Sequence, residues 1–154
     1  MKTTLLLNAL MICLILVSTD LIAQSTDSKS SAAPLDKETA WLTIENLDAK
    51  FSEDYRLGDS LALAATYTSD AQFGCLEGPE ILAAWGSSIR KSILNNTRTL
   101  KFTALSVWQQ DEFLISVGIY EKFDTDNNLI SDGRYLVTWK MEDGVWKIHR
   151  DFGL

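Results

Sequence analysis

The closing segment of the sequence combines a permanent cation with apolar side chains. Arg150 lies in "GVWKIHRDFG", residues 144–153. The two-residue period of a strand would place one set of alternate side chains on the same face: Trp146, Ile148, Arg150 and Phe152. A guanidinium stays charged at physiological pH and offers a planar fork of donors to a carboxylate or phosphate. Arg150 is therefore a candidate for binding an anionic ligand. The structural alternatives are an internal ion pair with Asp48 or Asp54, and a position at the pocket rim with the guanidinium in water.

Acid–base chemistry needs an inward carboxylate or histidine, and the sequence offers weak candidates. His149 and Asp151 have the opposite parity to Ile148, so we expect both to face outward, with Asp151 anchoring the chain end. Asp70 is typical of a turn or cap, and Glu77 lies at a possible pocket rim. The sequence has one histidine and no cysteines and histidines at the spacing of metal ligands, so we expect no metal site. Nothing in the sequence predicts a cofactor.

Composition limits the class of protein and of partner. The 154 residues are 46% hydrophobic and 23% charged, which is typical of one globular domain. The net charge is −7. An acidic surface repels phosphate backbones and anionic lipid headgroups, so we expect no nucleic-acid partner and no membrane binding through basic residues.

The first 23 residues predict export. Lys2 precedes an apolar run that ends near "LIAQ", and Ala23 is a plausible cleavage point for a secretory signal peptide. An uncleaved anchor and a lipoprotein cysteine at Cys13 are the alternatives. Residues 24–36 are polar and rich in serine, which predicts a flexible lead-in to a single domain over 37–154. We expect a secreted or periplasmic protein without stable membrane association. Cys75 is then its one cysteine, and a single cysteine cannot form an internal disulfide.

Periodicity predicts helices first and strands after. Apolar residues at spacings of three and four predict a helix over 37–56 that Gly58 ends. Asp59 then caps a shorter helix, and Gly78 with Pro79 opens a third. From Thr99 the period is two, which predicts strands over 100–109, 112–123, 134–141 and 145–152. The sequence therefore predicts an α+β fold, with three N-terminal helices on a strongly curved antiparallel sheet of four strands.

Both faces of the predicted strand 112–123 are largely apolar. One face carries Phe113, Ile115, Val117 and Ile119, and the other carries Leu114, Ser116, Gly118 and Tyr120. We assign the second face to the helices and a cavity, because Ser116 and Gly118 are small beside Tyr120. The first face needs another cover, and a second subunit is the simplest one.

Three segments resemble the nuclear transport factor 2-like superfamily: "GDSLALAATYTSDAQF", "EGPEILAAW" and the closing "GRYLVTWKMEDGVWKIHRDFG". The resemblance covers about residues 35–154 and is most specific in the closing segment, which looks like that of an uncharacterised, often secreted branch. The superfamily includes ketosteroid isomerases, SnoaL-type polyketide cyclases and the association domain of calmodulin-dependent kinase. The resemblance implies a cone with a pocket between helices and the concave sheet face, and homodimers paired through their sheets.

Carried onto this sequence, the resemblance implies a pocket lined from the first helix and the long strands, by Tyr55, Tyr67, Tyr120, Tyr135, Val137, Trp139, Ile148 and Arg150. Trp85 is a further candidate for the lining. In ketosteroid isomerase a tyrosine and a neutral aspartic acid bind the carbonyl oxygen while another aspartate moves the proton. The tyrosines of this sequence are candidates for such donors, with half-buried core positions as the alternative.

Three functions remain open at this stage, because one fold hosts both catalysts and binders. The first is a homodimeric binding domain for a small apolar molecule with an acidic group held by Arg150, without established catalysis. The second is an isomerase, cyclase or hydratase acting next to a carbonyl. The third is a dimerising interaction domain with a vestigial pocket. The lack of a recognisable acid–base pair places the enzyme second.

Overall fold

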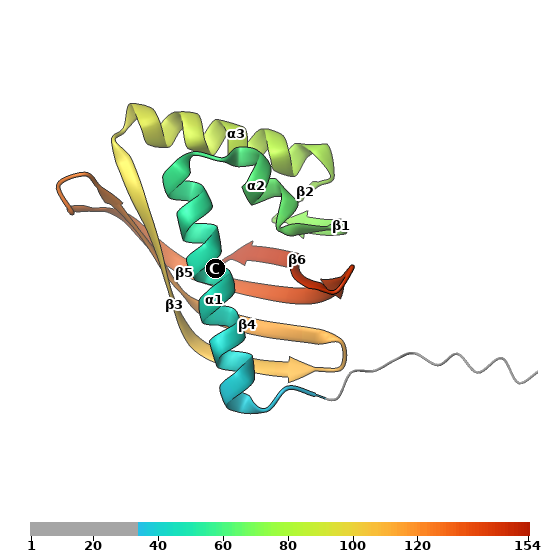
Figure 1. Ribbon diagram of the computed structural model, residues 1–154. Coiled ribbons are helices and arrows are strands. Elements are labelled where there is room, and N and C mark those ends of the chain that lie inside the picture. The colour runs from blue at the N-terminus through green and yellow to red at the C-terminus, as the bar shows by residue number, and fades with distance from the viewer. Residues whose placement is uncertain (1–33) are drawn as a thin grey trace, which may run out of the picture. The chain divides into compact units, whose positions relative to one another are not determined.

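The computed structural model of the chain describes residues 34–154, so the predicted signal peptide and most of the predicted lead-in lie outside the described residues. The elements run in the order α1 (Lys37–Leu57), α2 (Ser60–Ala65), β1 (Tyr67–Phe73), β2 (Leu76–Glu77), α3 (Pro79–Leu94), β3 (Thr97–Gln110), β4 (Phe113–Asp124), β5 (Leu129–Glu142) and β6 (Val145–Gly153). The strands form one sheet in the order β2-β1-β6-β5-β4-β3, and the helices cover one of its faces (Figure 1).

The predicted α+β class with helices on a curved sheet is confirmed, but the sheet has six strands and not four. Two helices, not three, precede the first strand, because β1 and β2 come before α3. β1 pairs in parallel with β6, some 80 residues later in the chain. A partner that distant leaves no local signal in a seven-residue segment, which is why the predicted strands begin only at residue 100.

The hairpin between β4 and β5 is longer than predicted. The sequence predicts a turn over 124–133, but β5 begins at Leu129. The Asp124 carboxylate accepts hydrogen bonds from the backbone N–H groups of Asp126 and Asn128, at 2.9 and 2.8 Å. Asn127 adopts the left-handed conformation with φ 68°. This side-chain-capped turn closes the hairpin within a few residues and frees the following residues for pairing.

Helix α1 begins and ends where its capping residues lie. The Asp36 carboxylate accepts from the Thr39 N–H at 2.9 Å, and Gly58 follows the last turn with φ 74°. One stripe of the helix is buried against the sheet, at Ala40, Ile44, Phe51 and Tyr55. Asp48 lies on the same stripe, four residues after Ile44 and three before Phe51. The helix therefore carries a carboxyl group into its apolar contact with the sheet.

Bulges curve the sheet and re-aim its side chains. In β6, Ile148 pairs with Trp139 but Arg150 pairs with Thr138, so His149 is an extra residue in the ladder. A bulge of this kind exchanges the faces of all residues beyond it. A second bulge in β3 leaves Leu105 unpaired opposite β4.

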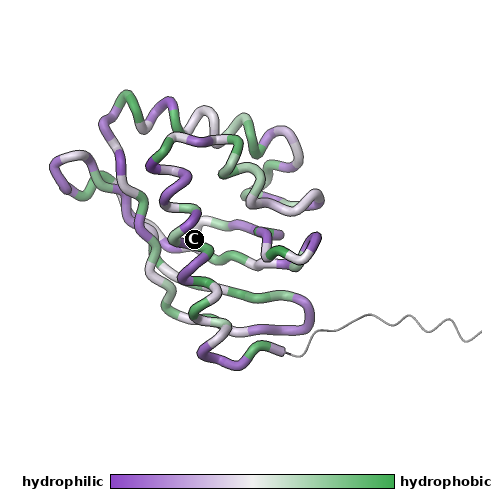
Figure 2. Tube along the Cα trace, viewed as in Figure 1, coloured by the Kyte–Doolittle hydropathy of each residue, from purple (hydrophilic) through white to green (hydrophobic). Residues whose placement is uncertain are grey.

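Hydrophobic residues concentrate along the strands and hydrophilic ones at the turns (Figure 2). No helix within residues 34–154 is long and apolar enough to cross a membrane.

Candidate functional site

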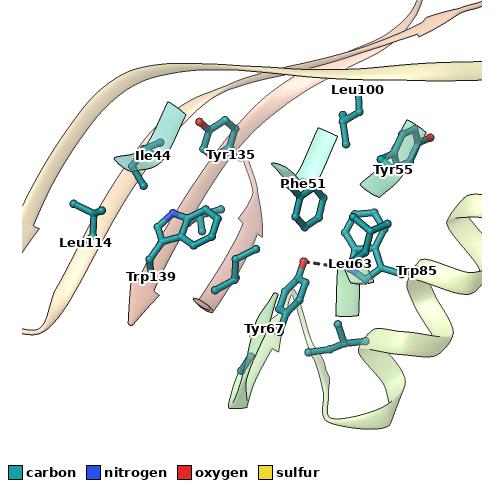
Figure 3. Close-up of a cluster of buried hydrophobic side chains, with 14 of the residues drawn as sticks. Ile44, Phe51, Tyr55, Leu63, Tyr67, Trp85, Leu100, Leu114, Tyr135 and Trp139 are labelled. Atoms are coloured by element: carbon teal, nitrogen blue, oxygen red, sulfur yellow. Dashed lines mark hydrogen bonds between the residues drawn. The ribbon is translucent and has the colours of Figure 1, made fainter. Parts of the chain in front are cut away.

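A cavity of about 190 Å³ lies among α1, α3 and the inner face of the sheet. Most of its wall is aromatic or aliphatic, and the rest is ionisable or polar. The lining residues are Asp48, Phe51, Phe73, Trp85, Leu100, Phe102, Tyr120, Lys122, Tyr135, Val137, Trp139, Ile148, Asp151 and Gly153. Figure 3 shows Tyr135 and Trp139 of β5 on one side of this cluster and Phe51, Tyr67 and Trp85 on the other. The space is large enough for a small organic molecule, and its walls are mainly apolar.

Asp48 brings a carboxyl group into the cavity from α1. Burial raises its pKa from 3.8 to about 7, and a hydrogen bond from Tyr135 lowers it in part. The Tyr135 hydroxyl donates to Asp48 Oδ2 at 3.3 Å, a long contact that leaves the carboxyl group largely available to a ligand. The Trp139 indole N–H donates to Ser116 Oγ at 3.2 Å, and Ser116 hydrogen-bonds the Tyr135 hydroxyl in turn. A chain of hydrogen bonds thus leads from Trp139 to Asp48.

Asp151 brings a second carboxyl group into the cavity from β6. Its inward direction follows from the bulge, because Asp151 pairs with Val137, whose side chain lines the cavity. Burial raises the pKa of Asp151 from 3.8 to about 6. The Tyr67 hydroxyl donates to Asp151 Oδ2 at 2.6 Å. It accepts from the Trp85 indole N–H at 3.3 Å (Figure 3). Since the indole can only donate, the Tyr67 proton is directed at Asp151.

Two tyrosines lie flat across glycines of the neighbouring strand. Tyr135 pairs with Gly118, and Tyr120 pairs with Gly133. A Cβ atom at Gly118 would come within 2.6 Å of the Tyr135 hydroxyl, and one at Gly133 within 2.7 Å of Tyr120. The space predicted beside Gly118 is thus covered by the Tyr135 ring, and the absence of side chains at both glycines lets the two phenols lie there.

Lys122 is the cation of the cavity wall. It follows Tyr120 by two residues in β4 and so shares its inward face. Its Nζ lies 5.8 Å from the ring centroids of both Tyr55 and Tyr120. Burial lowers the pKa of Lys122, and no carboxylate of residues 34–154 forms an ion pair with it.

The structure places the predicted pocket residues in three groups. Trp85, Tyr120, Tyr135 and Trp139 line the cavity, together with Val137 and Ile148. Tyr67 is buried behind Asp151 and reaches the cavity through that carboxyl group. Tyr55 is buried in the core, where it contacts Lys122 without forming part of the cavity wall.

Arg150 does not enter the cavity, so the predicted direction of its side chain is wrong. The bulge at His149 turns Arg150 and Phe152 to the outer face and Asp151 to the inner one. The Arg150 guanidinium donates to the backbone carbonyls of Asp70 and His149, at 3.0 and 2.7 Å. The expected outward placement of Asp151 is therefore also wrong, whereas His149 lies outside, stacked on Phe113 with 5.3 Å between ring centroids.

Sequence reasoning missed three ionisable residues of the cavity wall, and two of them left a signal. Asp48 lies on the apolar stripe of a helix, at the spacing of Ile44 and Phe51. Lys122 continues the alternation of inward residues in its strand. Asp151 left none, because its direction depends on a bulge that no residue type announces. Within the described part of the chain, no three His, Cys, Asp or Glu side chains gather as metal ligands would.

Comparison with solved structures identifies the fold. Aln2 from a Streptomyces species matches with a TM-score of 0.66 and 16% identity, over 78% of this chain and 92% of that chain. An NTF-2 like protein of unknown function from Shewanella oneidensis matches with a TM-score of 0.61 and 21% identity, over 73% of this chain and 97% of that chain. An NTF2-like protein with a cystatin-like fold from Novosphingobium aromaticivorans matches with a TM-score of 0.62 and 15% identity, over 74% of this chain and 80% of that chain. No protein-family model and no curated protein matches the sequence. At these identities the likeness shows the fold alone.

Proposed function

We propose that this chain, whose fold is that of nuclear transport factor 2-like proteins, binds a small, largely apolar carbonyl compound and moves a proton on the carbon next to that carbonyl. The observation that carries the proposal is the presence of two carboxyl groups in one apolar cavity, each hydrogen-bonded by a tyrosine hydroxyl. Such groups with pKa values near neutrality suit general acid–base catalysis. The reaction class is that of an isomerase, cyclase or hydratase.

Asp48 has the properties of the base. Its pKa of about 7 leaves a useful fraction ionised at neutral pH while keeping the carboxylate basic enough to take a proton. Its hydrogen-bond donor, the Tyr135 hydroxyl, lies 3.3 Å away, so the carboxylate is held loosely enough to turn toward a substrate. The aromatic wall limits the access of water, and a poorly hydrated carboxylate is a stronger base than a solvated one.

Asp151 has the properties of the acid that faces the carbonyl oxygen. It comes from β6, on a different wall of the cavity from α1, so a substrate can lie between the two carboxyl groups. Its pKa of about 6 leaves a minor fraction protonated at neutral pH, and this form can donate a hydrogen bond to an oxygen on which negative charge develops. The Tyr67 hydroxyl orients this carboxyl group, and the Trp85 indole fixes the direction of the Tyr67 proton.

The positions of the charged groups change the order of the three functions. Binding of an anionic group by Arg150 loses its basis, because the guanidinium lies on the outer face. The enzyme stood second for want of an acid–base pair, and Asp48 with Asp151 supplies one. A binding domain without turnover and an interaction domain with an unused pocket become outcomes of the experiment below.

Proton abstraction can be measured without knowing the natural substrate. The protein, residues 24–154, is incubated in D₂O at neutral pH with 2-tetralone, cyclohexanone and cyclohex-2-enone, and loss of the α-proton signals is followed by NMR. We expect exchange above the buffer rate for at least one ketone. Asp48→Asn should lower that rate by about 10²-fold or more, the usual contribution of a general base.

The matched control is Asp132→Asn, which removes the same charge from an exposed residue of β5. It should leave the exchange rate unchanged. Exchange equal to buffer for all three ketones, or exchange that survives Asp48→Asn, would contradict the proposed reaction. Binding of a ketone without exchange would return the chain to the class of binding domains.

Export and assembly are further parts of the proposal. Residues 1–23 have the pattern of a signal peptide, which we propose is cleaved to give a secreted or periplasmic chain. We also propose a homodimer through the outer sheet face, where Phe113, Ile115, Val117 and Ile119 alternate with the inward residues of β4. The mass of the mature chain from its own host tests the first proposal, and native mass spectrometry tests the second.

A further inference from the structure

Lys122 is the one cation among the lining residues of a cavity whose walls are mainly apolar. Its side chain extends from β4 into the same space as Asp48 and Asp151. Leu100 and Ser131 are its neighbours on the adjacent strands, and Leu100 is itself buried in the cavity wall. The flexible stem of a lysine normally carries the ammonium out into water. Here the ammonium stays between two aromatic rings at the cavity.

The two rings hold the ammonium without neutralising it. Nζ lies 5.8 Å from the ring centroids of Tyr55 and Tyr120, within the range of a cation–π interaction. Tyr55 is buried in the core, and Tyr120 lies over Gly133. Both rings are therefore fixed by packing, and they define one position for the charge.

The described part of the protein provides no counter-charge at this position. Burial is the cause of the lowered pKa of Lys122, and no carboxylate contributes to it. Conversely, Asp48 and Asp151 have raised pKa values with burial as the main cause, and Lys122 does not offset it in either case. A desolvated charge without a partner is unfavourable, so a ligand that brings one negative charge would relieve the cost of burying this ammonium.

We propose that the molecule bound in this cavity carries a single carboxylate, which binds the Lys122 ammonium while its apolar body contacts the aromatic wall. The inference rests on the proposed function, whose carbonyl substrate it narrows to a small apolar keto acid or a similar carboxylic acid. One ammonium balances one negative charge. A phosphate group carries more charge than that and would bring a second, uncompensated charge into an apolar space.

Matched pairs of probes separate charge from shape. Isothermal titration calorimetry at neutral pH compares 2-naphthoate with 2-naphthamide, and 4-phenylbutanoate with 4-phenylbutanamide. In each pair the two molecules have nearly the same size, and only one is charged. We expect the acid to bind at least about tenfold more tightly than the amide in one or both pairs, as a charge-assisted hydrogen bond in an apolar site requires.

The variants are Lys122→Met, which keeps the apolar stem, and Lys101→Met as a matched control. Lys101 lies on β3 with 62% of its side chain exposed, and its removal changes the net charge by the same amount. The preference for the acid should disappear in Lys122→Met, persist in Lys101→Met and return in part in Lys122→Arg. Circular dichroism establishes that each variant is folded. If Lys122→Met does not fold, Lys122→Gln replaces it.

Each result decides something. Equal binding of acid and amide, or a preference that survives in Lys122→Met, would overturn the inference and leave the proposed function standing, because a neutral molecule still occupies the cavity. Failure of all four probes to bind would contradict the inference and, with it, the binding on which the proposed function depends.

Discussion

The carboxyl group of Asp48 should make the stability of the protein depend on pH in a way that one substitution removes. In the unfolded chain Asp48 ionises near 3.8, whereas burial raises its pKa in the folded chain to about 7. The folded state therefore binds this proton more tightly. The contribution of the proton to stability is complete below pH 3.8, decreases as pH rises above that value, and is fully lost once pH has passed through about 7.

The size of the effect follows from the two pKa values. A rise from 3.8 to about 7 corresponds to about 4 kcal/mol at 1.36 kcal/mol per pKa unit. Because the side chain keeps some contact with water in the cavity, we expect roughly half of that value in practice, about 2 kcal/mol. Asp48→Asn has nearly the shape of the protonated acid but cannot ionise. It should match the wild type at about pH 4 and exceed its free energy of unfolding by about 2 kcal/mol at about pH 8.

Urea unfolding followed by circular dichroism, at half-unit steps from about pH 4 to about pH 8, measures this difference directly. Asp132→Asn is the control, because it removes an equal charge from an exposed site. The pH dependence that belongs to Asp48 is the part that this control does not share. A constant difference between Asp48→Asn and the wild type over the whole range would refute the reasoning, since it would mean that Asp48 ionises alike in the folded and unfolded states.

Three other substitutions test the geometry of the site and of the outer face. Tyr67→Phe removes the 2.6 Å hydrogen bond to Asp151, so urea unfolding should show a loss of about 1–3 kcal/mol, and the pKa of Asp151, measured by ¹³C NMR, should rise further. Gly118→Ala would bring a Cβ within 2.4 Å of a backbone carbonyl oxygen and should lower the free energy of unfolding by about 1–3 kcal/mol in thermal or urea unfolding. The control is Gly86→Ala in α3, where a Cβ has room. This change should be neutral or stabilising by up to about 1 kcal/mol. Ile115→Asp should convert a dimer to a folded monomer in native mass spectrometry, and a wild-type chain that is already monomeric would contradict the proposed interface.

The periodic parts of the sequence predicted the elements that position the site. The helical stripe through Ile44 and Phe51 and the alternation in 112–123 identified which faces meet, and the structure buries those faces. Side-chain period is a local property, so it can be read without knowing the partner of a strand. Tyr120 was found among the cavity residues for this reason, whereas Tyr135 and Trp139 were found through the resemblance to the nuclear transport factor 2-like superfamily.

What the sequence could not predict depends on pairing between distant strands. β1 joins the sheet beside β6, and its partner lies some 80 residues away. The bulge at His149 is a property of the β5–β6 ladder and not of any residue type, so strict alternation assigned Arg150 to the cavity and Asp151 to the outside. The error therefore reversed the sign of the charge expected in the site.

That same bulge separates the direction of a side chain from its place in the sequence. His149 is the extra residue of the ladder, so Arg150 pairs with Thr138 and Asp151 pairs with Val137. If β6 paired with β5 without the bulge and kept all its residues, regular alternation beyond Ile148 would carry Arg150 inward and Asp151 outward. The same residues could thus present either an acid or an anion receptor to the cavity. The pairing register of two strands, rather than the choice of residues, decides which ligand class this wall suits.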